Sequence, residues 1–254
     1  MNDRWVISIG TSHPWNVAGV GLDARVAAHY DLPHAAAIAA ISAQDAGGVR
    51  ALEAVSNAML QAQLDALPGP AGAYRIGALP GVQSVRTVAR YLRRAAGGVP
   101  IVVDPVLRAS LGGALHRDAD LPDALIAEFS ACGAIFTPNV EEAAQLCGLD
   151  VRDQAAMERA GRMLIERGAH AALITGGHLQ GDPVDVLVTR SGVERFGGPR
   201  LPGSMRGAGC TLAAALTCRL ALGADLRNAA ADAHAFVRER IAAAIVRGGL
   251  QVAF

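Results

Sequence analysis

Residues 134–148 read AIFTPNVEEAAQLCG and contain one complete strand–turn–helix unit. The apolar run Ala134–Phe136 predicts a short strand, and the polar turn Thr137-Pro138-Asn139 ends it. Glu141–Cys147 then predicts a helix that stops at Gly148. This unit is typical of α/β proteins, in which buried strands alternate with helices along the chain.

The same alternation extends in both directions from this unit. Further strands are predicted over Trp5–Gly10, Tyr74–Ile76, Pro100–Val103 and Ala171–Ile174. Further helices are predicted over Leu22–His29, Ala54–Leu67, Val82–Ala96, Leu121–Ala131, Asp153–Arg167, Gly207–Leu222 and Leu226–Val246.

Two segments need separate treatment. Val184–Thr189 and Val193–Phe196 predict a hairpin around Ser191-Gly192. Pro33–Ala43 stays open between two assignments, because its alanine content favours a helix while its length and polar exit favour a buried strand.

The order of elements predicts a three-layer α/β/α fold with a mostly parallel central sheet flanked by helices. We find no internal repeat and no low-complexity linker, so residues 1–254 are predicted to form a single domain. In such sheets the ligand crevice lies beyond the carboxyl ends of the strands. Unusual polar residues fall at or near those ends: Ser12-His13, Gln44, Asp104-Pro105, Asn139 and Thr175-Gly176-Gly177-His178.

Composition excludes several classes of protein. The chain has 254 residues, of which 52% are hydrophobic and 4% aromatic, so small aliphatic side chains must fill the core. All 23 basic residues are arginines, which excludes a lysine Schiff base and the lysine of a Walker A loop. The 23 acidic residues balance them, and a nucleic-acid partner is not expected from a net charge of zero.

Targeting signals are also missing from the sequence pattern. Residues 1–10 hold too short an apolar run for a secretory signal, and no window approaches the ~18 apolar residues of a membrane span. The four cysteines, Cys132, Cys147, Cys210 and Cys218, show no Cys-x-x-Cys spacing, which argues against a zinc site. We therefore expect a cytoplasmic protein with reduced thiols and no membrane contact.

The segment Arg206-Gly207-Ala208-Gly209-Cys210-Thr211 opens an apolar helix. Two glycines let the backbone turn sharply, and free N–H groups at a helix start favour an anion such as a migrating phosphoryl group. The same position predicts a lowered pKa for the Cys210 thiol. The alternative is a plain glycine-rich helix start with a buried cysteine.

Two acidic motifs also have structural explanations. Asn139 and Glu142 are spaced as a helix cap and its third-position partner, which predicts a capping box. Asp104 precedes Pro105 and is a common turn residue.

Taken in order, four motifs make the chain similar to the ribokinase-like superfamily, and within it to the hydroxymethylpyrimidine/phosphomethylpyrimidine kinases of thiamin biosynthesis. The motifs are Asp104-Pro105-Val106-Leu107, Thr137–Ala143, Gly176-Gly177-His178-Leu179 and Gly207–Leu212. The resemblance spans Ile7 to about Ala235. A cysteine after the Gly-x-Gly step resembles the pyrimidine kinases, whereas the sugar kinases carry Asp there.

The resemblance implies the reaction and its participants: an ATP-dependent kinase that phosphorylates the hydroxymethyl group of an aminopyrimidine or its monophosphate, acting with Mg²⁺ as a homodimer. Gly207, Ala208 and Gly209 would then form the anion hole, with Cys210 as base. Asn139 and Glu142 would organise Mg²⁺, through water, and the phosphates. Nucleotide and phosphate contacts would also come from Asp104, Thr175 and Gly177. The pyrimidine would contact Asp23, Gln44 and Thr11, since a glutamine amide suits a ring nitrogen beside an amino group.

The departures from the family pattern concern mainly the acceptor half of the site. His13, Trp15 and Asn16-Val17 replace an acidic residue and a glycine pair in the first loop, and Thr175 replaces a lysine. Arg206 and Arg108 are candidates to replace that lysine on the phosphates. Two alternatives therefore stay open: a pyridoxal-type kinase, and a catalytically silent sensor that binds pyrimidines.

Overall fold

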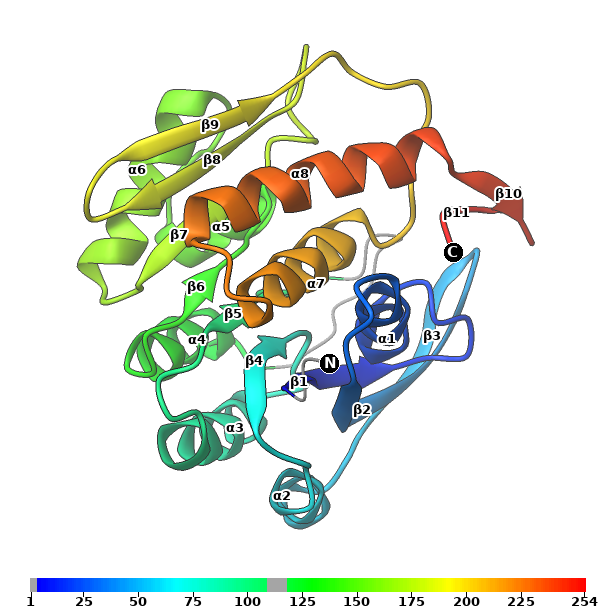
Figure 1. The fold of residues 1–254 in the computed structure, drawn as a ribbon, viewed down its shortest axis with the longest axis vertical. Helices are drawn as coiled ribbons and strands as arrows, with labels where there is room; N and C mark the ends of the chain where they lie inside the picture. Colours follow the sequence, from blue (N-terminus) through cyan, green and yellow to red (C-terminus); the bar gives the residue numbers. More distant parts are fainter. Residues whose placement is uncertain (1–3, 109–117) are drawn as a thin grey trace.

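A computed structural model describes residues 4–108 and 118–254. Within these ranges, nine strands form one sheet in the order β3-β2-β1-β4-β5-β6-β7-β8-β9 (Figure 1). The strands are β1 (Trp5–Ser12), β2 (His34–Asp45), β3 (Gly48–Ala54), β4 (Ala71–Ile76), β5 (Ile101–Val103), β6 (Ile135–Phe136), β7 (Ala171–Ile174), β8 (Val184–Thr189) and β9 (Val193–Gly197). The six strands from β2 to β7 in that order are parallel, while β3, β8 and β9 pair antiparallel.

Helices cover both faces of this sheet, as predicted. One face packs against α2 (Asn57–Asp65), α3 (Val82–Ala95), α4 (Leu121–Ser130), α5 (Val140–Cys147) and α6 (Gln154–Glu166). The other packs against α1 (Gly19–His29), α7 (Ala208–Ala221) and α8 (Leu226–Ala242). Figure 1 shows α1, α7 and α8 on the same side of the strands.

Alternation along the central strands explains these layers. On β5, Ile101 and Val103 face the five-helix side and Val102 faces the α7 side, and all three are nearly or fully buried. Side chains that alternate between two apolar layers produce a strand without polar positions, which is the pattern of a parallel sheet buried on both faces.

Three segments differ from the sequence-based assignment. The open segment Pro33–Ala43 forms strand from His34 onward, in β2. Its partner β3 was not predicted and includes Ala54, so the helix predicted over Ala54–Leu67 begins only at Asn57. The last predicted helix ends at Ala242 instead of Val246. The chain then forms a separate hairpin of β10 (Ile245–Arg247) and β11 (Leu250–Val252).

Candidate active site

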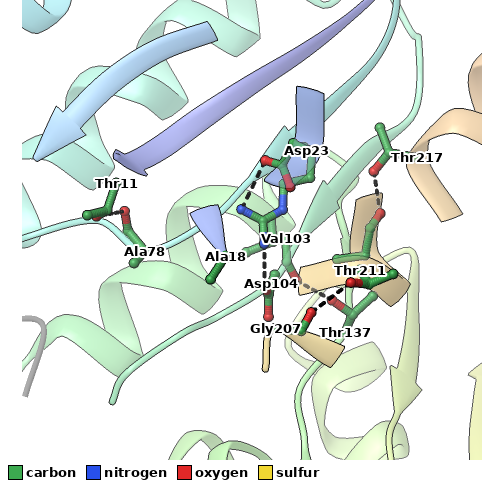
Figure 2. Close-up of polar contacts among 12 residues, drawn as sticks. Thr11, Ala18, Asp23, Ala78, Val103, Asp104, Thr137, Gly207, Thr211 and Thr217 are labelled. Atoms are coloured by element: carbon green, nitrogen blue, oxygen red, sulfur yellow. Dashed lines mark hydrogen bonds and ion pairs between the residues drawn. The ribbon is translucent and has the colours of Figure 1, made fainter. Parts of the chain in front are cut away.

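The start of α7 forms a turn at the predicted phosphate position, with Gly207 buried and Gly209 exposed. Gly207 has a φ of 78°, and a β-carbon there would lie 2.1 Å from the carbonyl oxygen of Val17. Thr211 holds the turn, because its N–H and its hydroxyl both donate to the Gly207 carbonyl, at 2.8 and 2.9 Å (Figure 2). The first N–H groups of a helix lack intrahelical acceptors, and Gly209 among them is exposed. An anion can therefore reach these groups.

Four side chains from different elements meet beside this turn. Arg75 on β4 forms ion pairs with Asp104, which follows β5, and with Asp23 on α1, the latter at 3.4 Å. Cys210, in the first turn of α7, lies close enough to Asp104 and Arg75 to interact electrostatically with both. Figure 2 shows the Asp23 and Asp104 carboxylates directed toward a common centre. Asp23, Arg75 and Asp104 are 1%, 1% and 4% exposed, so the cluster is internal.

This environment shows that the predicted low pKa of Cys210 is wrong. Burial raises the pKa of the Cys210 thiol to about 12; the Asp104 and Asp23 carboxylates act in the same direction, and Arg75 only partly opposes them. The helix start favours a thiolate, but desolvation beside two carboxylates outweighs that effect. The thiol is therefore protonated at neutral pH.

Burial also dominates the two carboxyl groups of the cluster. It raises the pKa of Asp23 to about 6, against the opposing charge of Arg75. It raises the pKa of Asp104 as well, although Arg75 and the Cys210 thiol both favour the ionised form. Because the Asp23 carboxylate faces Arg75, its contact with a pyrimidine stays a prediction.

Asn139 and Glu142 form the predicted capping box at the start of α5. Asn139 Oδ1 accepts from the N–H groups of Glu141 and Glu142, both at 2.9 Å, and Glu142 Oε2 accepts from the Asn139 N–H at 3.0 Å. Burial, reinforced by the charge of Asp104, raises the pKa of Glu142 to about 8. The two carboxyl groups are thus electrostatically linked, and their role toward Mg²⁺ or phosphate stays a prediction.

Thr175 lies next to the capping box. It forms a parallel bridge with Asn139, and its N–H donates to the Pro138 carbonyl at 3.0 Å. Gly177 follows on an exposed loop. The structure therefore brings Asp104, Glu142, Asn139 and Thr175 together along neighbouring strand ends. Gly177 lies at the rim of this group, in the exposed loop that follows β7 (the rim loop).

Sequence reasoning missed the residue that holds this rim. The guanidinium of Arg200 donates to the carbonyl groups of Gly177, Leu179 and Gly181, at 3.0, 2.5 and 2.8 Å. From the inner side, Asp185 accepts from the Gly176 N–H at 3.0 Å. No local pattern marks Arg200, because its partners lie about twenty residues earlier in the chain.

Thr11 and Gln44, predicted to contact the pyrimidine, lie near the ends of β1 and β2. The Thr11 hydroxyl donates to the Ala78 carbonyl at 3.2 Å and is almost fully buried (Figure 2). Gln44 Oε1 lies 3.5 Å from the guanidinium of Arg206, the residue before the phosphate turn. Arg206 therefore joins the acceptor side, while Arg108 is exposed. That Arg206 or Arg108 supplies the positive charge of the lysine replaced by Thr175 stays a prediction.

Trp15 packs against the C-terminal hairpin. A β-carbon on Gly248, at the turn between β10 and β11, would lie 2.5 Å from the Trp15 ring. Val17, Leu250 and Val252 complete this small apolar cluster. The hairpin also reaches the phosphate turn, because the Gln251 carbonyl accepts from the Arg206 N–H at 2.9 Å. The unusual first loop is thus covered by the end of the chain.

His13 is nearly buried and turned toward its own loop. Its Nε2 lies 3.0 Å from the Ala18 carbonyl oxygen and 3.2 Å from the Ala18 nitrogen. Burial lowers the pKa of His13, so the ring is neutral at pH 7. His13 therefore replaces the family's acidic residue with an uncharged loop contact.

Residues 4–108 and 118–254 contain no group of three or more His, Cys, Asp or Glu side chains arranged to hold a metal ion directly. Among the same residues, no helix combines the length and the apolar character needed to cross a membrane.

Solved structures of other proteins share this architecture. A phosphomethylpyrimidine kinase from Clostridium difficile 630 superposes with a TM-score of 0.81 at 26% identity, covering 93% of this chain and 98% of that one. Pyridoxal kinase from Staphylococcus aureus, in complex with AMP-PCP, gives 0.89 at 25% identity, with 98% and 92% covered. The fold and the site define a phosphotransferase of the ribokinase-like class.

Sequence comparison narrows this class. Residues 14–252 match the family model described as phosphomethylpyrimidine kinase. The hydroxymethylpyrimidine/phosphomethylpyrimidine kinase of Rhizobium meliloti is 35% identical over 94% of this chain and 90% of its own length. A thiamine biosynthesis bifunctional protein, ThiED, of Geobacter sulfurreducens is 32% identical over 93% of this chain and 49% of its length. The chain belongs to the phosphomethylpyrimidine kinase family.

Proposed function

We propose that this kinase transfers the γ-phosphoryl group of ATP to the hydroxymethyl group of 4-amino-5-hydroxymethyl-2-methylpyrimidine, to its monophosphate, or to both in succession. The observation that carries the proposal is the Gly207 turn with the exposed Gly209, beside the Cys210 thiol at the carboxyl edge of a parallel sheet. Backbone N–H groups that are fixed before the reaction stabilise charge that develops on a transferring phosphoryl group.

The nucleotide is assigned to the side of Asp104, Asn139, Glu142 and Thr175, with Gly177 at the rim. ATP as the phosphoryl donor follows from the kinase family, and the AMP-PCP complex of the staphylococcal relative supports it. Arg200 donates to three carbonyl groups of the rim loop, which occupies these acceptors. That arrangement leaves backbone donors for phosphate oxygens.

The residues present fit Mg²⁺ bound with its phosphate ligands. Glu142 and Asp104 are buried carboxyl groups, the charge of Asp104 raises the pKa of Glu142, and a cation beside them would favour their ionised forms. Mg²⁺ prefers oxygen ligands and keeps several waters, so Asn139 and Glu142 would hold it through water. When bound, Mg²⁺ would neutralise charge on the phosphates.

The acceptor is assigned to Thr11, Asp23 and Gln44. Gln44 offers both an amide donor and an acceptor, which suits an aminopyrimidine edge. In the reaction, the acceptor oxygen forms a bond to phosphorus as the bond to the leaving ADP oxygen breaks. Cys210 begins as a neutral thiol, so it can take the hydroxyl proton only as its own proton moves toward Asp104. A loose transition state requires little of such help.

An ADP-release assay with hydroxymethylpyrimidine, its monophosphate and pyridoxal tests the substrate. The proposal expects turnover with one or both pyrimidines at higher kcat/KM than with pyridoxal. The high structural similarity to pyridoxal kinase makes preferential pyridoxal turnover the second candidate. Measurable pyrimidine binding without turnover would instead support the silent sensor.

We further propose a homodimer in the cytoplasm. All four cysteines are free thiols, which fits a reducing compartment. Sedimentation of the purified protein over a concentration series measures the oligomeric state, and a constant monomer mass would contradict the dimer.

A further inference from the structure

Arg75 is a fully charged side chain placed inside the sheet. It lies on β4 between Tyr74 and Ile76, and only 1% of it is exposed. A buried guanidinium is unfavourable unless paired charges and hydrogen bonds compensate it. The two carboxylates that provide this compensation, Asp23 and Asp104, are themselves buried, so the three groups depend on each other.

These partners come from separate parts of the fold. Asp104 follows β5, the neighbour of β4, while Asp23 is on α1 and Cys210 is on α7 (Figure 1). The guanidinium also interacts electrostatically with the Cys210 sulfur. One side chain therefore connects the sheet with both helices that border the phosphate turn.

The backbone provides space for this guanidinium. A β-carbon on Gly77 would lie 2.1 Å from Arg75 Nη1 and 3.1 Å from its Cζ. Residues two apart on a strand point to the same side, so a side chain at position 77 would occupy the space of the Arg75 guanidinium. Gly77 is thus an independent sign that the position of the guanidinium is specified.

The planar fork of arginine is suited to this task. It can present separate N–H groups to two carboxylates in fixed directions, which a lysine ammonium cannot do. If the fork were removed, the Asp23 and Asp104 carboxylates would lie near the thiol without a compensating charge.

We propose that Arg75 is a positioning residue for phosphoryl transfer: its guanidinium, held between Asp23 and Asp104, fixes the Asp104 carboxylate against the Cys210 thiol beside the Gly207 turn. This inference rests on the proposed function, because the thiol and the turn are the groups that would meet the acceptor and the phosphoryl group. Arg75 itself would contact neither the acceptor nor the phosphoryl group.

The first test compares Arg75→Gln, Arg75→Lys and Gly77→Ala. Arg75→Gln and Gly77→Ala are expected to lower kcat by ~10²-fold, the scale of a misplaced reacting group. Arg75→Lys keeps the charge and should recover part of kcat. Arg167→Gln is the matched control, since Arg167 also bridges two segments, at Leu146 and Asp123, but far from the site.

The second test reads the site without turnover. Alkylation of each cysteine by iodoacetamide is followed by peptide mass spectrometry at pH 8, with Cys132 and Cys147 as internal references. With the guanidinium removed in Arg75→Gln or displaced in Gly77→Ala, Cys210 should react at least ~3-fold more slowly, because thiolate formation is less favourable there. If Arg75→Gln is too unstable to study, Gly77→Ala still provides this readout, because it displaces the guanidinium without removing its charge.

The outcomes separate the two proposals. Unchanged kcat and unchanged Cys210 alkylation in folded Gly77→Ala would overturn the role of Arg75. Equal losses of kcat in Arg75→Lys and Arg75→Gln, with unchanged alkylation, would also overturn it by indicating structure alone. Failure of the wild-type chain to phosphorylate any pyrimidine would refute the proposed function, while the alkylation test would still report on the cluster.

Discussion

The carbonyl oxygen of Val17 lies against Gly207, so closely that a β-carbon at this position would be 2.1 Å away. This contact joins the acceptor loop, which follows β1, to the phosphate turn, which begins α7. The two halves of the site are therefore in direct backbone contact, and a change in one half is transmitted to the other.

Replacing Gly207 tests this contact. Gly207→Ala adds a backbone clash to the strain of a left-handed conformation, so we expect kcat to fall by more than ~10²-fold. Gly223→Ala is the control, because Gly223 has a φ of 87° but open space around its β-carbon position. Steady-state kinetics of the two variants separate the clash from the strain, and equal activities would contradict the prediction.

The role of the Cys210 thiol is tested by truncation. We expect Cys210→Ala to lower kcat by at least ~10²-fold, and Cys210→Ser to lose less because a hydroxyl can also donate to Asp104. Cys218→Ala, which removes a buried cysteine from the same helix, controls for packing. Near-normal kcat in Cys210→Ala would eliminate proton transfer through sulfur but leave the phosphate turn intact.

The titration of Asp23 predicts how stability depends on pH. The folded-state pKa of about 6 lies above the value near 4 of an unfolded aspartate. The folded chain therefore binds more protons between these values, and the free energy of unfolding falls as pH rises from about 4 to 6. At about 1.4 kcal/mol per unit, the loss is at most roughly 3 kcal/mol.

Asp23→Asn should remove this component of the slope. Urea unfolding of both proteins at several pH values measures this slope. As pH rises from about 4 to 6, the free energy of unfolding of the wild type should fall relative to that of Asp23→Asn. Parallel curves for the wild type and Asp23→Asn would show that the carboxyl group titrates normally in the folded state.

Arg200 is expected to act on the nucleotide side alone. Arg200→Ala removes three carbonyl contacts from the loop around Gly177, so KM for ATP should rise by ~10-fold while KM for the acceptor stays constant. Arg238→Ala serves as the control, since Arg238 donates to Pro199 outside that loop. Equal changes in both KM values for Arg200→Ala would indicate a general loss of structure instead.

Features encoded over a few residues could be predicted from the sequence. The strand–turn–helix unit at 134–148 and its capping box are local, because Asn139 and Glu142 need only each other and the helix start. The central strands were visible as short apolar runs because both of their faces are buried.

Features that depend on distant partners could not be predicted in this way. The strand β10 is exposed at all three positions, so no apolar pattern separated it from the preceding alanine-rich helix. The pKa of Cys210 was predicted in the wrong direction because the local sequence shows only the helix start. The opposing carboxylates arrive from Asp23 and Asp104, far away in the chain. Arg75 had one available signal, a charged residue inside an apolar strand.

The space that Gly77 leaves for Arg75 restricts how this family can diverge. A lineage that acquires a side chain at position 77 must shorten or redirect the residue at position 75, and the reverse change is equally constrained. Substitutions at these two sites should therefore appear in pairs among distant homologues, with the single intermediates selected against.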